Sequence, residues 1–204
     1  MKPVLPISYF GNIAYYWYLA KYKSVLISLN EIYQKQTFRN RCVVLGANGP
    51  LNLSVPVERP YGKLTKTKDV LISEAENWRQ VHWKTLESCY NRTPYFEFYA
   101  DDLKALLFSN FKTLAQLNIA LTNELVEKIG LINNLQLISD TLHIDAEDKR
   151  EEFSPKKNSS FKSYPYLQTF TERFGFSNNL SILDLLFNEG PNSICILNES
   201  KHEH

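Results

Sequence analysis

Residues 77–103, NWRQVHWKTLESCYNRTPYFEFYADDL, decide how the rest of this chain folds. At about 100° per residue, the side chains on one side of a helix are Trp78, His82, Leu86 and Cys89. Asn77 is a suitable N-cap, and Pro94 ends the helix because the residue before a proline avoids helical geometry. The stretch therefore predicts an amphipathic helix that packs against a core.

Arg79 and His82 interrupt the apolar side of this helix. An unpaired buried charge is costly, so an arginine here must find a partner or extend towards solvent. One interpretation is that Arg79 caps the edge of the core and that His82 is a hydrogen-bonded core histidine. The other is that the helix lines a pocket and that both groups face a ligand. The pattern alone does not separate the two.

Length and composition exclude several classes of protein. The 204 residues suffice for one sizeable core and are few for two domains. A formal charge of +1 gives no field that would attract nucleic acid. No apolar run approaches the roughly 20 residues of a membrane span, and the N-terminus lacks the apolar run of a signal peptide. We therefore expect a cytoplasmic protein with no membrane span and no nucleic-acid partner.

Cysteine and aromatic residues point to no cofactor. Cys42, Cys89 and Cys195 have no C-x-x-C spacing, so they predict neither a zinc site nor a disulfide framework. The 12 Tyr, 12 Phe and 3 Trp occur largely in clusters. Such clusters more often build a core than a surface on which carbohydrates stack. No metal site follows from the sequence, and any cofactor is unknown.

The N-terminus predicts a strand–helix–strand unit. Residues 4–8 are a short apolar run, residues 12–22 have the length of a helix, and residues 25–29 (VLISL) have the composition of a strand. Such a unit directs the first N–H groups of its helix towards the crevice beyond the first strand, where anions bind. The unit carries neither G-x-G-x-x-G nor a Walker loop, so this signal is weak.

Residues 31–41, EIYQKQTFRNR, are polar and basic. In an extended chain, Lys35, Arg39 and Arg41 point to the same side. Three cations beside amide side chains such as that of Asn40 suit a phosphate or carboxylate group. The alternative is a solvated edge strand that its cations protect from pairing.

The middle of the chain predicts a hairpin and two further helices. Residues 42–45 and 51–57 form strands around Asn48-Gly49, a favoured turn dipeptide. Residues 69–73 and 135–138 are short strand candidates. A long amphipathic helix covers residues 110–130 and ends at a glycine. We expect Asp101 and Asp102 in the first turn of the preceding helix, where acids face the helix dipole favourably.

The C-terminal part combines a charged segment with helices. The hydrophobic pattern stops over residues 145–163, which predicts a mobile charged loop within one domain of 204 residues. Residues 164–175 and 180–188 fit two helices. Asp184 lies among apolar residues and is either exposed or an intramolecular acceptor. Residues 201–204 are expected to be a frayed tail.

Three segments in fixed order hold more specific motifs: EIYQKQTFRNRCVVLGANGPLNLSVPV, KDVLISEAENWRQVHWKTLESCYNRTPYFEFYADDL and LSILDLLFNEGPNS. Together they resemble the bacterial WbqC-like family, and the start PISYFGNIAYYWYLAKY is similar to the family's Pro-x-x-Tyr start. The resemblance implies a role in O-antigen or other surface-polysaccharide biosynthesis, with amino-acid (glycine) transfer suggested for some members. Longer members are similar but carry a Ser-Gly-Pro-Gly-type loop, which the charged segment near residues 155–163 replaces.

The predicted fold is a single α/β domain with an N-terminal strand–helix–strand unit, a β-hairpin and a largely helical C-terminal half. The expected function is that of a transferase-type enzyme acting on an anionic small molecule, either a sugar nucleotide or an activated amino acid. The alternative is a non-catalytic binding or scaffold protein of the same pathway.

His82 is the candidate general acid or base because its ordinary pKa lies near neutrality. Cys42 and Cys89 are candidate nucleophiles, although no paired His–Cys motif supports them. The expected substrate-binding residues are Tyr9, Tyr33, Lys35, Arg39, Asn40, Arg41 and Arg79.

Overall fold

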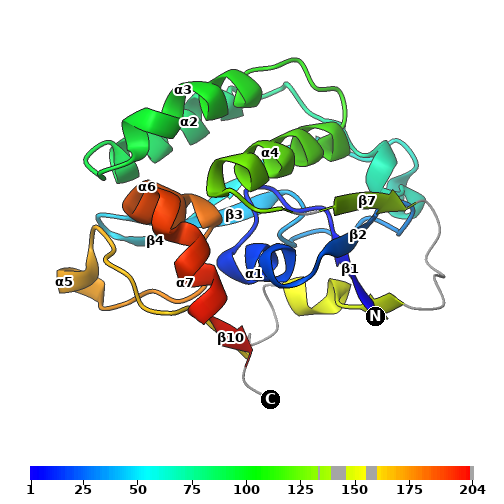
Figure 1. Ribbon diagram of the computed structural model, residues 1–204. Helices are drawn as coiled ribbons and strands as arrows, with labels where there is room; N and C mark the ends of the chain where they lie inside the picture. Colours follow the sequence, from blue (N-terminus) through cyan, green and yellow to red (C-terminus); the bar gives the residue numbers. More distant parts are fainter. Residues whose placement is uncertain (133, 139–145, 155–159, 203–204) are drawn as a thin grey trace.

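The computed structural model describes residues 1–132, 134–138, 146–154 and 160–202 (Figure 1). Its centre is a four-stranded sheet in the order β7-β2-β1-β8, in which all three strand pairs are parallel. The strands are β1 (Lys2–Pro6), β2 (Ser24–Ser28), β7 (Asn134–Ile138) and β8 (Ala146–Asp148). The predicted α/β class is confirmed.

Helix α1 (Ile13–Lys21) connects β1 to β2, as the strand–helix–strand pattern predicted. Every residue from Ile13 to Leu19 is buried. The burial has two sources, because α1 packs against β2 and also against the C-terminal helices α6 (Ile182–Glu189) and α7 (Ser193–Glu199). The chain ends are thereby joined through the first helix.

The predicted hairpin is formed by β3 (Arg41–Gly46) and β4 (Gly49–Ser54). Its turn residues are Ala47 and Asn48, and Gly49 follows with φ +111°, a value that L side chains rarely adopt. A second, short pair joins β5 (Val57–Glu58) to β6 (Leu71–Ile72). The extended conformation that was one option for residues 31–41 occurs only at Ile32, which forms a bridge with Lys66, and at Arg41, because residues 33–40 form turns and loop.

Three helices follow the hairpin: α2 (Trp78–Tyr90), α3 (Phe96–Leu107) and α4 (Leu114–Ile129). The break at Pro94 and the stop at Gly130, which has φ +76°, are as predicted. The expectation that Asp101 and Asp102 begin a helix is wrong, since α3 begins five residues earlier at Phe96. Asp102 pairs with Lys128 of α4 at 2.6 Å, so it links α3 to α4.

The described residues of the charged segment 145–163 include short regular elements. Its strand β8 pairs with β1, and a turn of 3-10 helix at Arg150–Phe153 follows it. Phe153 is only 2% exposed and packs against Tyr15 and Tyr18 of α1. Backbone pairing with the edge of β1 and burial of the Phe153 ring stabilise this structure despite the charge of the segment. Residues 145 and 155–159 lie outside the described residues.

Two expectations for the C-terminus need correction. The helix expected over residues 164–175 is a single turn, α5 (Thr171–Phe174). Residues 201 and 202 are not frayed, because β10 (Lys201–His202) pairs with β9 (Phe161–Lys162). Helix α6 is present as predicted, and α7 was not predicted. No helix in the described part of the chain has the length and apolar character to cross a membrane.

Candidate functional site

The N-terminus of α1, where the sequence suggested an anion site, is occupied by the protein itself. The N–H of Ile13 donates to the Leu180 carbonyl at 2.9 Å, and that of Ala14 donates to Asn179 Oδ1 at 2.9 Å. The N–H of Tyr15 donates to the side chain of its cap, Asn12, at 3.0 Å. Since these donors have partners, none is left to bind a phosphate.

A basic pocket of about 500 Å³ is lined by residues that follow β2 along the chain. Its lining combines the loop after β2 with the strands that follow: Tyr33, Lys35, Gln36, Asn40, Arg41, Ser54, Val57 and Arg59. We call this cavity the basic pocket, because three of its residues are cations and none of the described residues that line it carries a carboxylate.

The charges of the basic pocket are not neutralised. Among the described residues, Lys35, Arg41 and Arg59 form no ion pair. The Nε of Arg41 and the Oδ1 of Asn40 are shielded from solvent and have no hydrogen-bond partner in this part of the chain. Burial raises the pKa of Tyr33 to about 12, and the positive charges of nearby arginines oppose that shift. The pocket therefore holds an excess of positive charge.

Arg39 does not line this pocket and pairs with Glu31 instead. It is 2% exposed, and its Nε and Nη2 both lie 2.7 Å from Glu31 Oε1. The other oxygen of Glu31 pairs with Arg150 at 3.2 Å. Arg39 is thus matched by a buried carboxylate, which explains why a full charge is tolerated in the interior.

Tyr9 and His82 form a buried pair. The Tyr9 hydroxyl lies 2.9 Å from His82 Nδ1, and both residues contact Trp78. Burial lowers the pKa of His82 to about 4, although a hydrogen bond to the backbone of Ser54 opposes the shift. His82 is only 4% exposed and does not line the basic pocket, but Ser54 does.

Arg79 lies at the edge of the core. Its Nε donates to the Leu107 carbonyl at 2.9 Å, its Nη1 pairs with Glu74, and its guanidinium covers the ring of Trp78 at 4.5 Å. The structure brings four of the predicted residues into one pocket: Tyr33, Lys35, Asn40 and Arg41. It places four others elsewhere: Tyr9, Arg39, Arg79 and His82.

Sequence reasoning missed Arg59, which completes the cationic lining. A usable signal existed, because the hairpin register pairs Arg41 with Ser54. That register returns the chain after residue 54 to the side of the pocket, and Arg59 follows β5. The arginine is therefore close in space through the hairpin, although it is 18 positions away from Arg41 in sequence.

The two candidate nucleophiles are poorly activated. Burial raises the pKa of the Cys42 thiol well above its ordinary value. Burial and the charge of Asp184 raise that of Cys89 to about 11. A thiol must lose its proton to attack, so both cysteines fit a packing role. No group of three or more His, Cys, Asp or Glu residues suited to a metal occurs within the described ranges.

Asp184 is the intramolecular acceptor that the sequence allowed, and it is 1% exposed. It accepts hydrogen bonds from Tyr90 at 3.1 Å, Tyr166 at 2.6 Å and Gln168 at 3.0 Å. Burial raises the pKa of its carboxyl group, and the three hydrogen bonds oppose that shift. The contacts join α2, α6 and residues 166–168.

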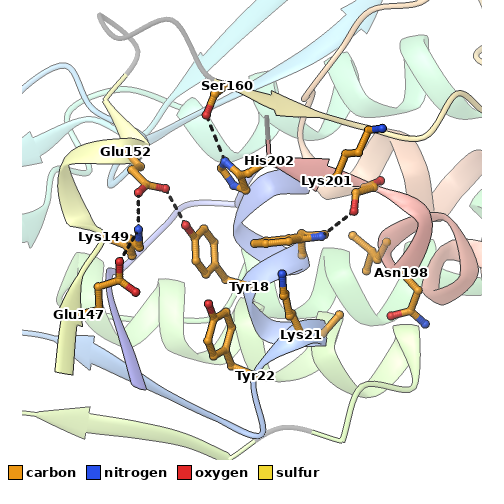
Figure 2. A pocket seen from close by; sticks show the side chains of 14 residues that line it. Tyr18, Lys21, Tyr22, Glu147, Lys149, Glu152, Ser160, Asn198, Lys201 and His202 are labelled. Atoms are coloured by element: carbon orange, nitrogen blue, oxygen red, sulfur yellow. Dashed lines mark hydrogen bonds and ion pairs between the residues drawn. The ribbon is translucent and has the colours of Figure 1, made fainter. Parts of the chain in front are cut away.

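A second cavity, also of about 500 Å³, lies beside the C-terminal end of α1 (Figure 2). Trp17, Tyr18 and Tyr22 contribute aromatic rings, and charged residues of both signs surround them. We call it the aromatic pocket. It shares no lining residue with the basic pocket.

The comparison with known proteins decides the family. A sequence profile described as the WbqC-like protein family matches residues 8–159. The chain belongs to the WbqC-like protein family. The matched region contains every residue that lines the basic pocket in this WbqC-like protein.

The chain is also similar to a protein of Mycobacterium tuberculosis (strain ATCC 25618 / H37Rv) named "Uncharacterized protein Rv1507c". The two are 26% identical over 186 residues, which cover 78% of this WbqC-like protein and 80% of the relative. No solved structure matches the chain significantly.

Proposed function

We propose that this WbqC-like protein binds an anionic, activated donor in the basic pocket and acts in the cytoplasm as a transferase of surface-polysaccharide biosynthesis. The observation that carries the proposal is the charge of the pocket: its three cations form no ion pair with any described residue, and its described lining has no carboxylate. Such a lining attracts phosphate or carboxylate groups, and arginine binds them through two parallel hydrogen bonds. The pathway and the transfer reaction rest on the family resemblance.

The same charges favour a sugar nucleotide over an activated amino acid. An aminoacyl donor carries an ammonium group, which Lys35, Arg41 and Arg59 would repel at close range. A sugar phosphate carries hydroxyl groups that are neutral and both donate and accept. Among the described residues no donor reaches Asn40 Oδ1, and a ligand hydroxyl is a suitable one.

The role of His82 as general acid or base stays a prediction. With a pKa of about 4 the ring is neutral near pH 7, yet it does not line the pocket and instead forms a hydrogen bond with the backbone of Ser54, which does. We therefore propose that His82 positions Ser54 through their hydrogen bond. The second candidate function is non-catalytic binding of the same ligand, which the same pocket supports because it needs no proton transfer.

Calorimetric titration with UDP-glucose, glucose 1-phosphate, inorganic phosphate and glycine tests the proposal. We expect the two sugar phosphates to bind most tightly. Arg41→Ala should weaken their binding at least about tenfold, or about 1.4 kcal/mol, since it removes a charge-assisted contact. Arg92→Ala is the matched control, because Arg92 is exposed and outside the pocket.

Equal affinity of the parent and Arg41→Ala for every phosphate would contradict the proposed site. Turnover of the donor separates the enzyme from the binding protein. If His82 transfers a proton, His82→Ala removes turnover and leaves affinity within about tenfold. If the parent turns over no donor that it binds, the non-catalytic alternative is supported.

A further inference from the structure

The aromatic pocket is built from four segments that are far apart in sequence. They are the end of α1, the region of β8 and the following 3-10 turn, the residue before β9, and the end of α7 with β10. A volume of about 500 Å³ lies within the range of small-molecule sites. We propose that this pocket is a second binding site, which takes an uncharged, polyhydroxylated ring such as a pyranose sugar. The inference does not rest on the function proposed for the basic pocket.

One wall of the pocket is a set of polar groups that bond to one another. Lys149 Nζ lies between Glu147 at 2.7 Å and Glu152 at 3.0 Å, and the Tyr18 hydroxyl donates to Glu152 at 2.7 Å (Figure 2). These contacts orient the side chains before any ligand arrives. Each carboxylate keeps further acceptor sites, and the ammonium group keeps a donor. The wall therefore offers both kinds of hydrogen bond.

Lys21, Asn198 and Lys201 line the pocket from α1, the end of α7 and β10 (Figure 2). The Nζ of Lys21 lies 4.4 Å from the centre of the Trp17 ring. An anion that approached these lysines would also meet the two carboxylates, and a cation would meet the lysines. A hydroxyl group avoids the conflict because it donates and accepts without a net charge. The mixed lining thus favours a neutral ligand with several hydroxyl groups.

The aromatic rings supply the third requirement of a sugar site. Tyr18 and Tyr22 stack with 5.8 Å between ring centres and 17° between planes. Tyr18 is buried and supports Tyr22, whose ring is only partly buried. A pyranose has one face made mainly of C–H groups, which packs on an amphipathic ring of this kind. Carboxylate and amide groups line the same pocket and are able to form hydrogen bonds with the ring hydroxyls.

The test is saturation-transfer-difference NMR combined with calorimetric titration of the full chain. The neutral probes are methyl α-glucoside, methyl α-galactoside and N-acetylglucosamine. The charged comparators are glucosamine and glucuronate. We expect at least one neutral probe to bind with a dissociation constant on the order of 1 mM and to bind more tightly than both comparators.

Variants locate the binding. Tyr22→Ala should weaken the neutral probe at least about tenfold, and Glu147→Gln, a change at a partly exposed residue, should weaken it about threefold or more. Tyr61→Ala, at a tyrosine that is 67% exposed and outside the pocket, should leave affinity unchanged. Arg41→Ala should also leave it unchanged, which separates this site from the basic pocket.

The inference would be overturned by no binding of any neutral saccharide, by tighter binding of a charged comparator, or by parent-like affinity in both Tyr22→Ala and Glu147→Gln. Loss of saccharide binding in Arg41→Ala would assign the sugar to the basic pocket and would also overturn it. If phosphates do not bind but a neutral saccharide does, only the function proposed for the basic pocket is contradicted.

Discussion

The side chain of Asn179 accepts the backbone N–H of Ala14 at 2.9 Å, across 165 positions of sequence. This contact closes the N-terminus of α1, the position at which many α/β proteins bind phosphate. The C-terminal segment therefore takes the place that an anionic ligand would occupy. Three cations that form no ion pair among the described residues, Lys35, Arg41 and Arg59, lie instead in the basic pocket.

Replacement of Asn179 separates its two contributions. Asn179 has φ +56°, which alanine adopts only with strain and glycine adopts freely. Asn179→Gly should lose only the hydrogen bond and cost about 1 kcal/mol of unfolding free energy. Asn179→Ala should cost about 2–3 kcal/mol, because the backbone strain adds to that loss. Urea unfolding measures the free energy of unfolding of both variants. Equal values would contradict a contribution from backbone strain at residue 179.

His82 should make stability depend on pH. Its pKa of about 4 in the folded state lies below the ordinary value of 6.5, so the unfolded chain binds more protons between these values. The free energy of unfolding should therefore fall by on the order of 2–3 kcal/mol as the pH drops from about 6.5 to about 4. Urea unfolding across this range should show a smaller fall in His82→Gln, since carboxylate effects are common to both proteins. Identical pH profiles would exclude a buried neutral histidine.

The hydrogen bonds of Asp184 should contribute measurably to stability. Tyr166→Phe removes the shortest of the three, at 2.6 Å, and leaves a buried carboxylate with less support. We expect a loss of about 1–3 kcal/mol in thermal or urea unfolding. Tyr164→Phe is the control, because Tyr164 is 49% exposed, and its change should stay within about 0.5 kcal/mol. If Tyr166→Phe has the stability of the parent, the hydrogen bonds from Tyr90 and Gln168 are enough to stabilise the buried Asp184.

Phe153 should anchor the charged segment to α1. Phe153→Ala removes a ring that is 2% exposed, which should cost about 3–5 kcal/mol of unfolding free energy. Phe98→Ala deletes the same ring at a position that is 75% exposed and should cost less than about 0.5 kcal/mol. Limited proteolysis of Phe153→Ala should show faster cleavage near this segment than the parent does. Equal stability of the two variants would show that the segment is not docked.

Local chemistry determined much of the architecture from sequence alone. The apolar side of α2, the proline break after it and the glycine stop of α4 are signals that short stretches carry by themselves. The strand–helix–strand unit and the hairpin are equally local, since turn residues and alternation specify them. Lys35 and Arg41 were recognised as parts of one site because the loop and strand that carry them are adjacent in sequence.

Tertiary structure decided what has no local signature. Strand β8 exists because the edge of β1 supplies its hydrogen-bond partners, and a charge-rich sequence does not reveal such a distant partner. Glu31 removes Arg39 from the predicted cluster, whereas the hairpin adds Arg59 to it. His82 is buried because Tyr9, Trp78 and the backbone near Ser54 enclose it. Which charged and aromatic side chains contact one another depends on distances that only the packed chain sets. The sequence therefore indicated the residue types of the candidate site, and the fold determined which of those residues line the pocket.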